Sequence, residues 1–137
     1  MGEIRVKVLL TNSMDEALHR RKKLKKSQIR RYEADALVDT GAIRSVIPAH
    51  VMERLGVLAS GQRVAEYADG RKETVGLTEP ILFEILGRNT QDEALVLGDE
   101  VLIGQTVLEK LDLLADCANH RIVPNPAHPD QPVSKVK

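Results

Sequence analysis

Short segments in which apolar and polar residues alternate recur along the chain, and they limit the possible folds more than any other feature. Residues 4–10, 32–39 and 81–85 place their side chains alternately on two faces, which is typical of half-buried β-strands. The chain has 39 Val, Leu and Ile residues but only three aromatic ones, so its core must be aliphatic. Because β-branched residues favour strands, we predict a mainly β fold.

Turn signals divide the remaining apolar segments into further strands. Asp69-Gly70 is a strong signal for a tight turn, so the segments on either side of it are expected to form a hairpin. Further strands are expected at residues 64–67, 74–77, 94–97 and 101–104, and a last one around 113–116 and 122–123.

Three short helices are expected between the strands. Ser13 with Glu16 fits a capping box, and Thr106 with Glu109 fits a second one. A two-turn helix is expected over residues 48–55, with Pro48 in its first turn and Gly56 after its end.

The chain length allows a single domain over residues 1–137. We expect a basic helical or loop insertion at about 13–31 and an irregular, proline-rich tail from about 124.

The basic segment, residues 20–31, carries most of the positive charge. Residues 1–31 contain ten Lys and Arg against three Asp and Glu, whereas residues 32–137 contain ten against seventeen. Such a segment can bind nucleic acid or an acidic partner, or it can be a solvated helix or loop between two strands. Because residues that stack on bases are almost absent, we favour the solvated segment and expect no nucleic-acid partner.

Several classes of protein do not fit the sequence. No apolar run approaches the roughly 20 residues of a membrane-spanning helix, and the first residues do not resemble a secretory signal. The single cysteine, Cys117, cannot form an internal disulfide, and its neighbours favour a small buried hydrophobe over a reactive thiol. No Cys/His cluster has the spacing of a zinc site. We expect a cytoplasmic protein with no membrane attachment, metal or organic cofactor.

The strongest candidate site is the segment Ala-Leu-Val-Asp-Thr-Gly-Ala at residues 36–42. An apolar strand here delivers the Asp39 carboxylate, the Thr40 hydroxyl and then Gly41 into a turn. The tripeptide alone is weak evidence, because Asp and Gly are ordinary turn residues. A second apolar pair followed by glycine, Leu102-Ile103-Gly104, leads into a helical pattern further along the chain.

These segments, in this order, resemble the retropepsin-like aspartic proteases over roughly residues 32–124. The resemblance implies a small closed β-barrel with short helices. It identifies residues 39–42 with the catalytic loop, 102–104 with the second motif of the family, and the Asp69-Gly70 hairpin with the flap. The residues implied are catalytic Asp39, loop-supporting Thr40, Gly41 and Ala42, flap or substrate-binding Tyr67, Asp69 and Gly70, and Leu102, Ile103 and Gly104 of the second motif. For Tyr67, a strand residue that packs its ring on a neighbour is the interpretation we favour over a substrate contact.

A competing segment for the second motif, Ile-Leu-Gly-Arg-Asn at residues 85–89, is even closer to the retroviral form. No helical pattern follows it, whereas one follows Gly104. We therefore assign the second motif to Gly104 and interpret Gly87 as a hairpin turn.

The resemblance also implies a mechanism with two carboxylates that share a proton, as in aspartic proteases generally. Two like charges about 3 Å apart cannot both ionise cheaply, so one group stays protonated. This chain has one Asp-Thr-Gly segment, and a two-fold homodimer would bring one Asp39 from each subunit together. The expected activity is hydrolysis of peptide bonds in a peptide or protein.

Two alternatives remain open at this point. The first is a catalytically weak fold of the same type that acts as a peptide-binding or dimerisation module. The second is nucleic-acid binding through the basic segment, which a steep salt dependence of the affinity would favour.

Overall fold

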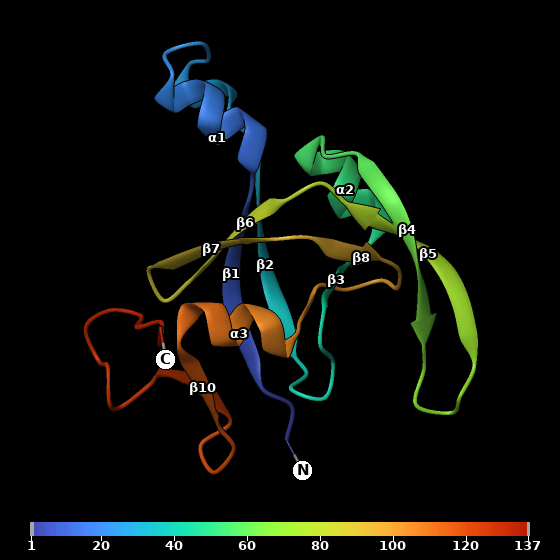
Figure 1. Ribbon diagram of the computed structural model, residues 1–137, viewed down its shortest axis with the longest axis vertical. Helices are drawn as coiled ribbons and strands as arrows, with labels where there is room; N and C mark the ends of the chain where they lie inside the picture. The colour runs from blue at the N-terminus through green and yellow to red at the C-terminus, as the bar shows by residue number, and fades with distance from the viewer. Residues whose placement is uncertain (1, 137) are drawn as a thin grey trace.

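The computed structural model describes residues 2–136, and most of its regular structure is β-sheet (Figure 1). The strands are β1 (Arg5–Asn12), β2 (Arg31–Val38), β3 (Ser45–Ile47), β4 (Ala59–Glu66), β5 (Lys72–Thr78), β6 (Ile81–Ile85), β7 (Arg88–Asp92), β8 (Ala94–Val96), β9 (Leu102–Ile103), β10 (Leu113–Asp116) and β11 (Arg121–Pro124). The helices are α1 (Ser13–Arg20), α2 (Ala49–Leu55) and α3 (Gln105–Leu111), with a 3₁₀ turn, η1 (Lys26–Gln28). The prediction of a mainly β fold with short helices is confirmed.

Nine strands form one sheet in the order β4-β5-β8-β3-β9-β2-β1-β6-β7, and β10 pairs with β11 in a separate hairpin. The sheet is mixed: β1 pairs antiparallel with β2 and β6, whereas β2 with β9 and β3 with β8 are parallel. This order has two ends, and no pairing within residues 2–136 joins them. The expected closed barrel is therefore not confirmed.

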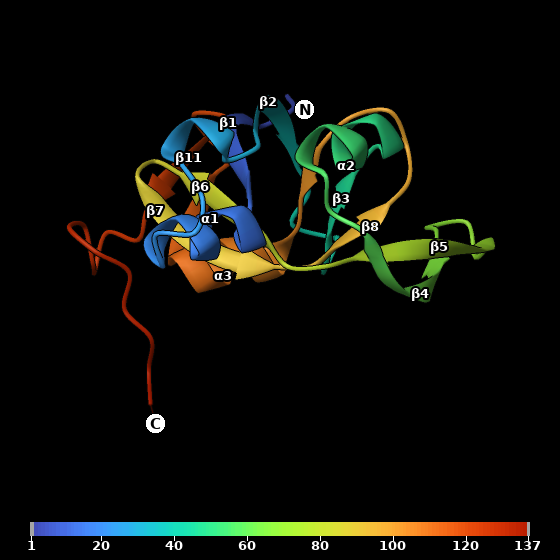
Figure 2. The same cartoon turned by 90° about the horizontal axis from the view of Figure 1, so that it is seen from above.

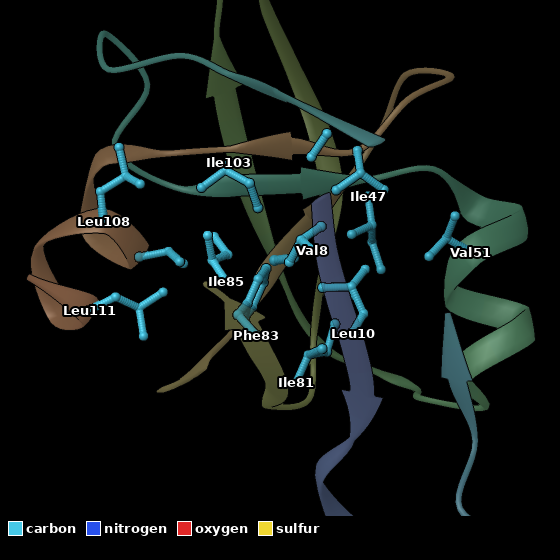
Figure 3. Packing of buried hydrophobic residues seen from close by; sticks show 14 of the residues in the cluster. Val8, Leu10, Ile47, Val51, Ile81, Phe83, Ile85, Ile103, Leu108 and Leu111 are labelled. Carbon is cyan, nitrogen blue, oxygen red and sulfur yellow. The ribbon is translucent and has the colours of Figure 1, made fainter. Parts of the chain in front are cut away.

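The core lies between this strongly bent sheet and helices α2 and α3 (Figure 3). Leu10, Ile47, Phe83 and Leu111 are fully buried and come from four different elements. Because these side chains are almost all aliphatic, shape matching between branched side chains holds the layers together.

Three predictions about where the helices begin are wrong. Asn12, not Ser13, caps α1, since the Asn12 side chain accepts a hydrogen bond from the Asp15 N–H at 2.9 Å. The residue before α3 is Gly104, with no side-chain cap, so the second capping box is also wrong. In both places the helix follows directly on a strand, and the last strand or linking residue takes the cap position. Pro48 likewise precedes α2 rather than lying in its first turn.

The predicted turn glycines Gly56 and Gly87 agree with the structure better than the predicted helix starts do. Gly56 ends α2 with φ +67°, as expected for a glycine after a helix. Leu86 and Gly87 join β6 to β7 with φ values of +53° and +78°, so the interpretation of Gly87 as a hairpin turn is confirmed.

The basic segment runs from the end of α1 through η1 to the start of β2. The lysines of this segment are exposed. Its end near β2 is held to α1, because the carboxylate of Asp15, which is 5% exposed, accepts hydrogen bonds from Arg30. The guanidinium of Arg30 donates at 2.8 and 3.0 Å, and its backbone N–H donates at 3.0 Å. Ile29 is buried beside this pair. Figure 1 places α1 and this segment at one end of the molecule.

The tail after β11 contains no helix or strand up to residue 136, yet its first part is tied to α3. The Asp112 carboxylate accepts hydrogen bonds from the side chains of Asn125 and His128 and from the Val133 N–H. Buried Arg88 donates to the carbonyl oxygens of Leu111, Asp112 and His128.

Cys117 is exposed, so the prediction of a buried thiol is wrong. Strand β10 ends at Asp116, and Cys117 begins the turn to β11 instead of continuing the strand into the core.

Within residues 2–136, none of the helices combines the length and hydropathy that crossing a membrane requires.

Candidate active site

The sheet places the two predicted motifs side by side. β2 pairs in parallel with β9, with Leu37 opposite Leu102 and Val38 opposite Ile103. The next residue along β2 is Asp39, whose N–H donates to the Ile103 carbonyl oxygen at 3.0 Å. Two segments far apart in the sequence therefore meet at the carboxyl ends of these strands.

The loop after β2 exposes and orients the Asp39 carboxylate. Gly41 donates its N–H to Asp39 Oδ1 at 2.9 Å, and the Ala42 N–H donates to the Asp39 carbonyl oxygen at 3.1 Å. Asp39 and Thr40 are exposed, and Asp39 Oδ2 has no hydrogen-bond partner among residues 2–136. One carboxylate oxygen is thus fixed by the backbone while the other faces solvent.

Gly104 packs directly against the backbone of this loop. An added Cβ at Gly104 would lie 2.6 Å from the Arg44 carbonyl group and 2.8 Å from the Ile43 carbonyl oxygen, both of them backbone atoms. Only glycine allows so close an approach. The first residues of α3 then bond back to the loop, from the Gln105 N–H to the Ala42 oxygen at 2.7 Å and from the Thr106 N–H to the Ile43 oxygen at 3.1 Å.

Ser45 is a supporting residue that sequence reasoning missed. It is fully buried, and its hydroxyl oxygen accepts a hydrogen bond from the Gly104 N–H at 2.9 Å. In the sequence, the signal for this role was a polar residue next to an apolar segment, six positions after Asp39. Without this acceptor the buried Gly104 N–H would lose its partner.

The hairpin of β4 and β5 extends to one side of the molecule (Figure 2), and hydrogen bonds order the turn between its strands. Tyr67 and Arg71 close the turn through the Tyr67 N–H and the Arg71 oxygen at 2.8 Å, and Asp69 Oδ1 accepts from the Arg71 N–H at 2.9 Å. Gly70 has φ +85°, as the Asp-Gly signal predicted.

Tyr67 packs its ring on a neighbour. The Arg71 guanidinium lies 4.3 Å from the ring centroid, and the Tyr67 hydroxyl donates to Glu73. This hydrogen bond to a carboxylate raises the pKa of Tyr67 above its ordinary value. The Tyr67 side chain thus contacts its neighbours within the hairpin, and Tyr67 also lines the groove described next.

A groove of about 730 Å³ separates the Asp39 loop from the hairpin. Its walls are the loop over residues 41–44 and the hairpin over residues 64–68, and its floor is formed by Val46, Leu95, Leu97 and Leu102. Asp39 also lines the groove, whereas Asp69, Gly70, Ile103 and Gly104 do not. An apolar groove of this size beside an exposed carboxylate can hold the side chains of an extended peptide.

Within residues 2–136, no group of three or more His, Cys, Asp or Glu side chains is arranged to hold a metal ion.

The sequence matches no model of a known protein family and no curated protein. Many solved structures share its fold, including the following three. The retroviral protease-like domain of Ddi1 from Leishmania major is 17% identical, with a TM-score of 0.54 and 90% of each chain covered. EIAV protease in complex with the inhibitor HBY-793 is 18% identical, with a TM-score of 0.51, covering 79% of this chain and 86% of that one.

The third structure is the foamy viral protease-reverse transcriptase in complex with an RNA/DNA hybrid, 18% identical with a TM-score of 0.51. The match covers 77% of this chain but only 11% of that much longer one. At these identities the likeness establishes a shared architecture, and the chain has the retropepsin-like fold.

Proposed function

We propose that this chain is an aspartic endopeptidase whose active site forms when a homodimer pairs two Asp39 carboxylates. The observation that carries the proposal is the position of Asp39: it is exposed, it is oriented by the Gly41 N–H, and it lines a groove large enough for a peptide. The retropepsin-like fold, shared with retroviral proteases, supports this assignment.

The dimer follows from the number of carboxylates that the chemistry needs. The chain has one Asp-Thr-Gly segment, so one chain supplies half of a pair. Ile43, 75% exposed beside the Asp39 loop, gives this face an apolar residue that a second copy would cover. Thr40, also exposed here, would brace the two loops through its hydroxyl.

In the dimer, one Asp39 carries a proton and the other is ionised, because two negative charges so close together repel. The ionised group takes a proton from a water molecule as the water oxygen bonds to the scissile carbonyl carbon. The protonated group gives its proton to the carbonyl oxygen. In the intermediate, a tetrahedral diol, the group that took the proton from water gives it to the nitrogen as the C–N bond breaks. The other carboxylate takes the proton of one diol hydroxyl, so an acid and an amine are released and the pair again holds one proton.

The β4–β5 hairpin would close over the bound peptide and exclude water. Its position supports this role, because Val64, Ala65 and Tyr67 line the groove opposite the Asp39 loop. A peptide-binding module with weak catalysis would use the same groove, and the following experiment separates the two functions.

The test is digestion of a peptide library by the native protein and by Asp39→Asn. Asparagine has nearly the same shape as aspartate but cannot act as a general base, so we expect cleavage to be lost and the fold kept. Asp35→Asn, the same change at an exposed position on β2, is the matched control and should cleave normally. Full activity of Asp39→Asn would contradict the proposal, and peptide binding without cleavage by the native protein would favour the module.

A further inference from the structure

The groove beside Asp39 contains few charged side chains. Fourteen of the described residues line it, and Arg44 and Glu66 are the charged ones among them apart from Asp39. Glu66 lies at the exposed end of β4. Arg44 lies at the start of the groove floor, next to the apolar side chains on which a peptide would rest.

Arg44 lies immediately before β3 and lines the groove. Ser45 and Ala94 are opposite each other in the parallel pair of β3 and β8, and both are fully buried. The residues that precede this pair, Arg44 and Glu93, lie just outside the strands and are half-buried, and their charged groups are 3.6 Å apart. Val46, two positions after Arg44, also lines the groove.

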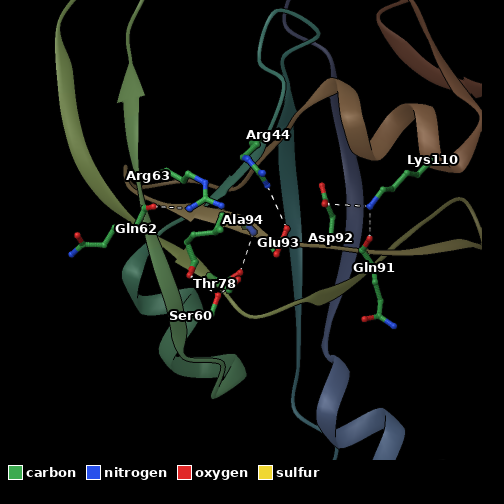
Figure 4. A network of polar contacts seen from close by, with 11 residues as sticks. Arg44, Ser60, Gln62, Arg63, Thr78, Gln91, Asp92, Glu93, Ala94 and Lys110 are labelled. Atoms are coloured by element: carbon green, nitrogen blue, oxygen red, sulfur yellow. Dashed lines mark hydrogen bonds and ion pairs between the residues drawn. The ribbon is translucent and has the colours of Figure 1, made fainter.

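The Arg44 guanidinium makes no hydrogen bond to the described residues. Its side chain is 35% exposed, and its one ionic contact within residues 2–136 joins Nη1 to Glu93 Oε1 at 3.6 Å (Figure 4). This distance is too long for a hydrogen bond, so the N–H donors of Arg44 lack acceptors among the described residues. A carboxylate that reaches them can form two parallel, charge-assisted hydrogen bonds.

We propose that Arg44 is a specificity-determining residue that selects peptides with a glutamate or aspartate near the scissile bond, next to apolar residues. This inference rests on the proposed function. In a two-fold dimer the groove contains two copies of Arg44, one on each side of the paired Asp39 residues. The acidic preference therefore occurs at two positions, one on each side of the bond that is cut.

Glu93 competes with the substrate for the same guanidinium. Removal of its charge frees Arg44, so Glu93→Gln has the opposite effect to Arg44→Gln. The two variants together distinguish recognition by Arg44 from a general disturbance of the groove. A general disturbance would lower the cleavage of all peptides by both variants.

The experiment uses a peptide that the native protein cleaves, with Glu, Gln or Lys placed in turn at each position near the scissile bond. At one position on each side, we expect kcat/KM for the Glu peptide to exceed that for the Gln peptide about tenfold, mainly through KM. Arg44→Gln abolishes this ratio and Glu93→Gln increases it. Arg31→Gln, the same change at an exposed residue at the far end of β2, keeps the native ratio.

Equal cleavage of Glu and Gln peptides by the native protein at every position would overturn this inference and leave the proposed function intact. If Arg44→Gln does not fold, Glu93→Gln decides: an unchanged or reduced Glu-to-Gln ratio overturns the inference. If no peptide is cleaved by the native protein, the proposed function fails and the inference fails with it.

Discussion

The reason why a position requires glycine differs between Gly104 and Gly70, and composition alone does not show it. Gly104 and Gly70 are both glycines near the groove, yet Gly104 is required because backbone atoms lie within 2.8 Å of where a Cβ would be. Gly70 has no atoms within 4 Å of that point, and its requirement is the positive φ of +85°. Glycine is therefore required at Gly104 because neighbouring backbone lies close to it, and at Gly70 because the turn needs a positive φ.

Asp112 makes the attachment of the tail sensitive to pH. Hydrogen bonds from the Asn125 side chain, the Val133 N–H and His128 lower the pKa of Asp112 below its ordinary value of 3.8. A carboxylate with a lowered pKa stabilises the folded state fully above its unfolded pKa, and this stabilisation is lost as the pH falls through the folded pKa.

We therefore expect Asp112→Asn to lower the free energy of unfolding at neutral pH, and the difference from the native protein to shrink below about pH 4. Asparagine tolerates the positive φ of +56° at this position, so the backbone is little strained. Urea unfolding over a series of pH values measures the difference, with Asp130→Asn in the exposed tail as the control. A difference that does not change with pH would contradict this account.

At the scale of elements, the sequence predicted the types of most strands and helices but not their ends. Alternation identifies β1 and β6 because one face of each is buried, and Ile81, Phe83 and Ile85 are fully buried. The capping boxes failed because Asn12 and Gly104, the residues that link strand to helix, take the cap positions. Local patterns do not show where the preceding strand stops.

The hairpin of β4 and β5 is predicted to matter more for turnover than for stability. Gly70→Val places a β-branched residue at a φ of +85° and would misdirect the hairpin turn. We expect a several-fold loss of kcat with little change in Tm. Gly87→Val, at a φ of +78° in the open β6–β7 turn, is the matched control, with similar backbone strain but normal turnover. Equal losses of folding and activity in Gly70→Val would make the hairpin purely structural.

The basic segment is predicted to be a solvated connection. It ends where β2 begins, and the eight residues of β2 separate it from Asp39 by about 26 Å. Exposed charges are screened over about 10 Å at 0.1 M salt. We therefore expect cleavage of a neutral peptide to be nearly unchanged when glutamine replaces Arg21, Lys22, Lys23, Lys25 and Lys26.

Loss of dimerisation or of cleavage at moderate salt in this variant would show that the basic segment is functional. Salt-dependent binding of nucleic acid by the native protein that the variant lacks would instead support the nucleic-acid alternative.

At the scale of the whole molecule, the sequence was least informative about which strands pair. Alternation shows which face of a strand is buried, but not its partner. The parallel pairing of β2 with β9, which brings Asp39 beside Ile103, was not predicted, since the resemblance to a family named the two motifs but not their pairing. The pairing of β3 with β8, which places Arg44 beside Glu93, was not predicted, and for that reason both residues were missed.

Two chains, each of 15.2 kDa, are proposed to form one active site from two Asp39 carboxylates. The active species should therefore sediment at about twice this mass. The most direct test mixes native and Asp39→Asn chains, refolds them together so that subunits exchange, and measures peptide cleavage. Only dimers of two native chains retain both carboxylates, so activity should fall with the square of the native fraction, to about a quarter in an equal mixture. Activity that falls in proportion to the native fraction, to about half, would contradict the shared site.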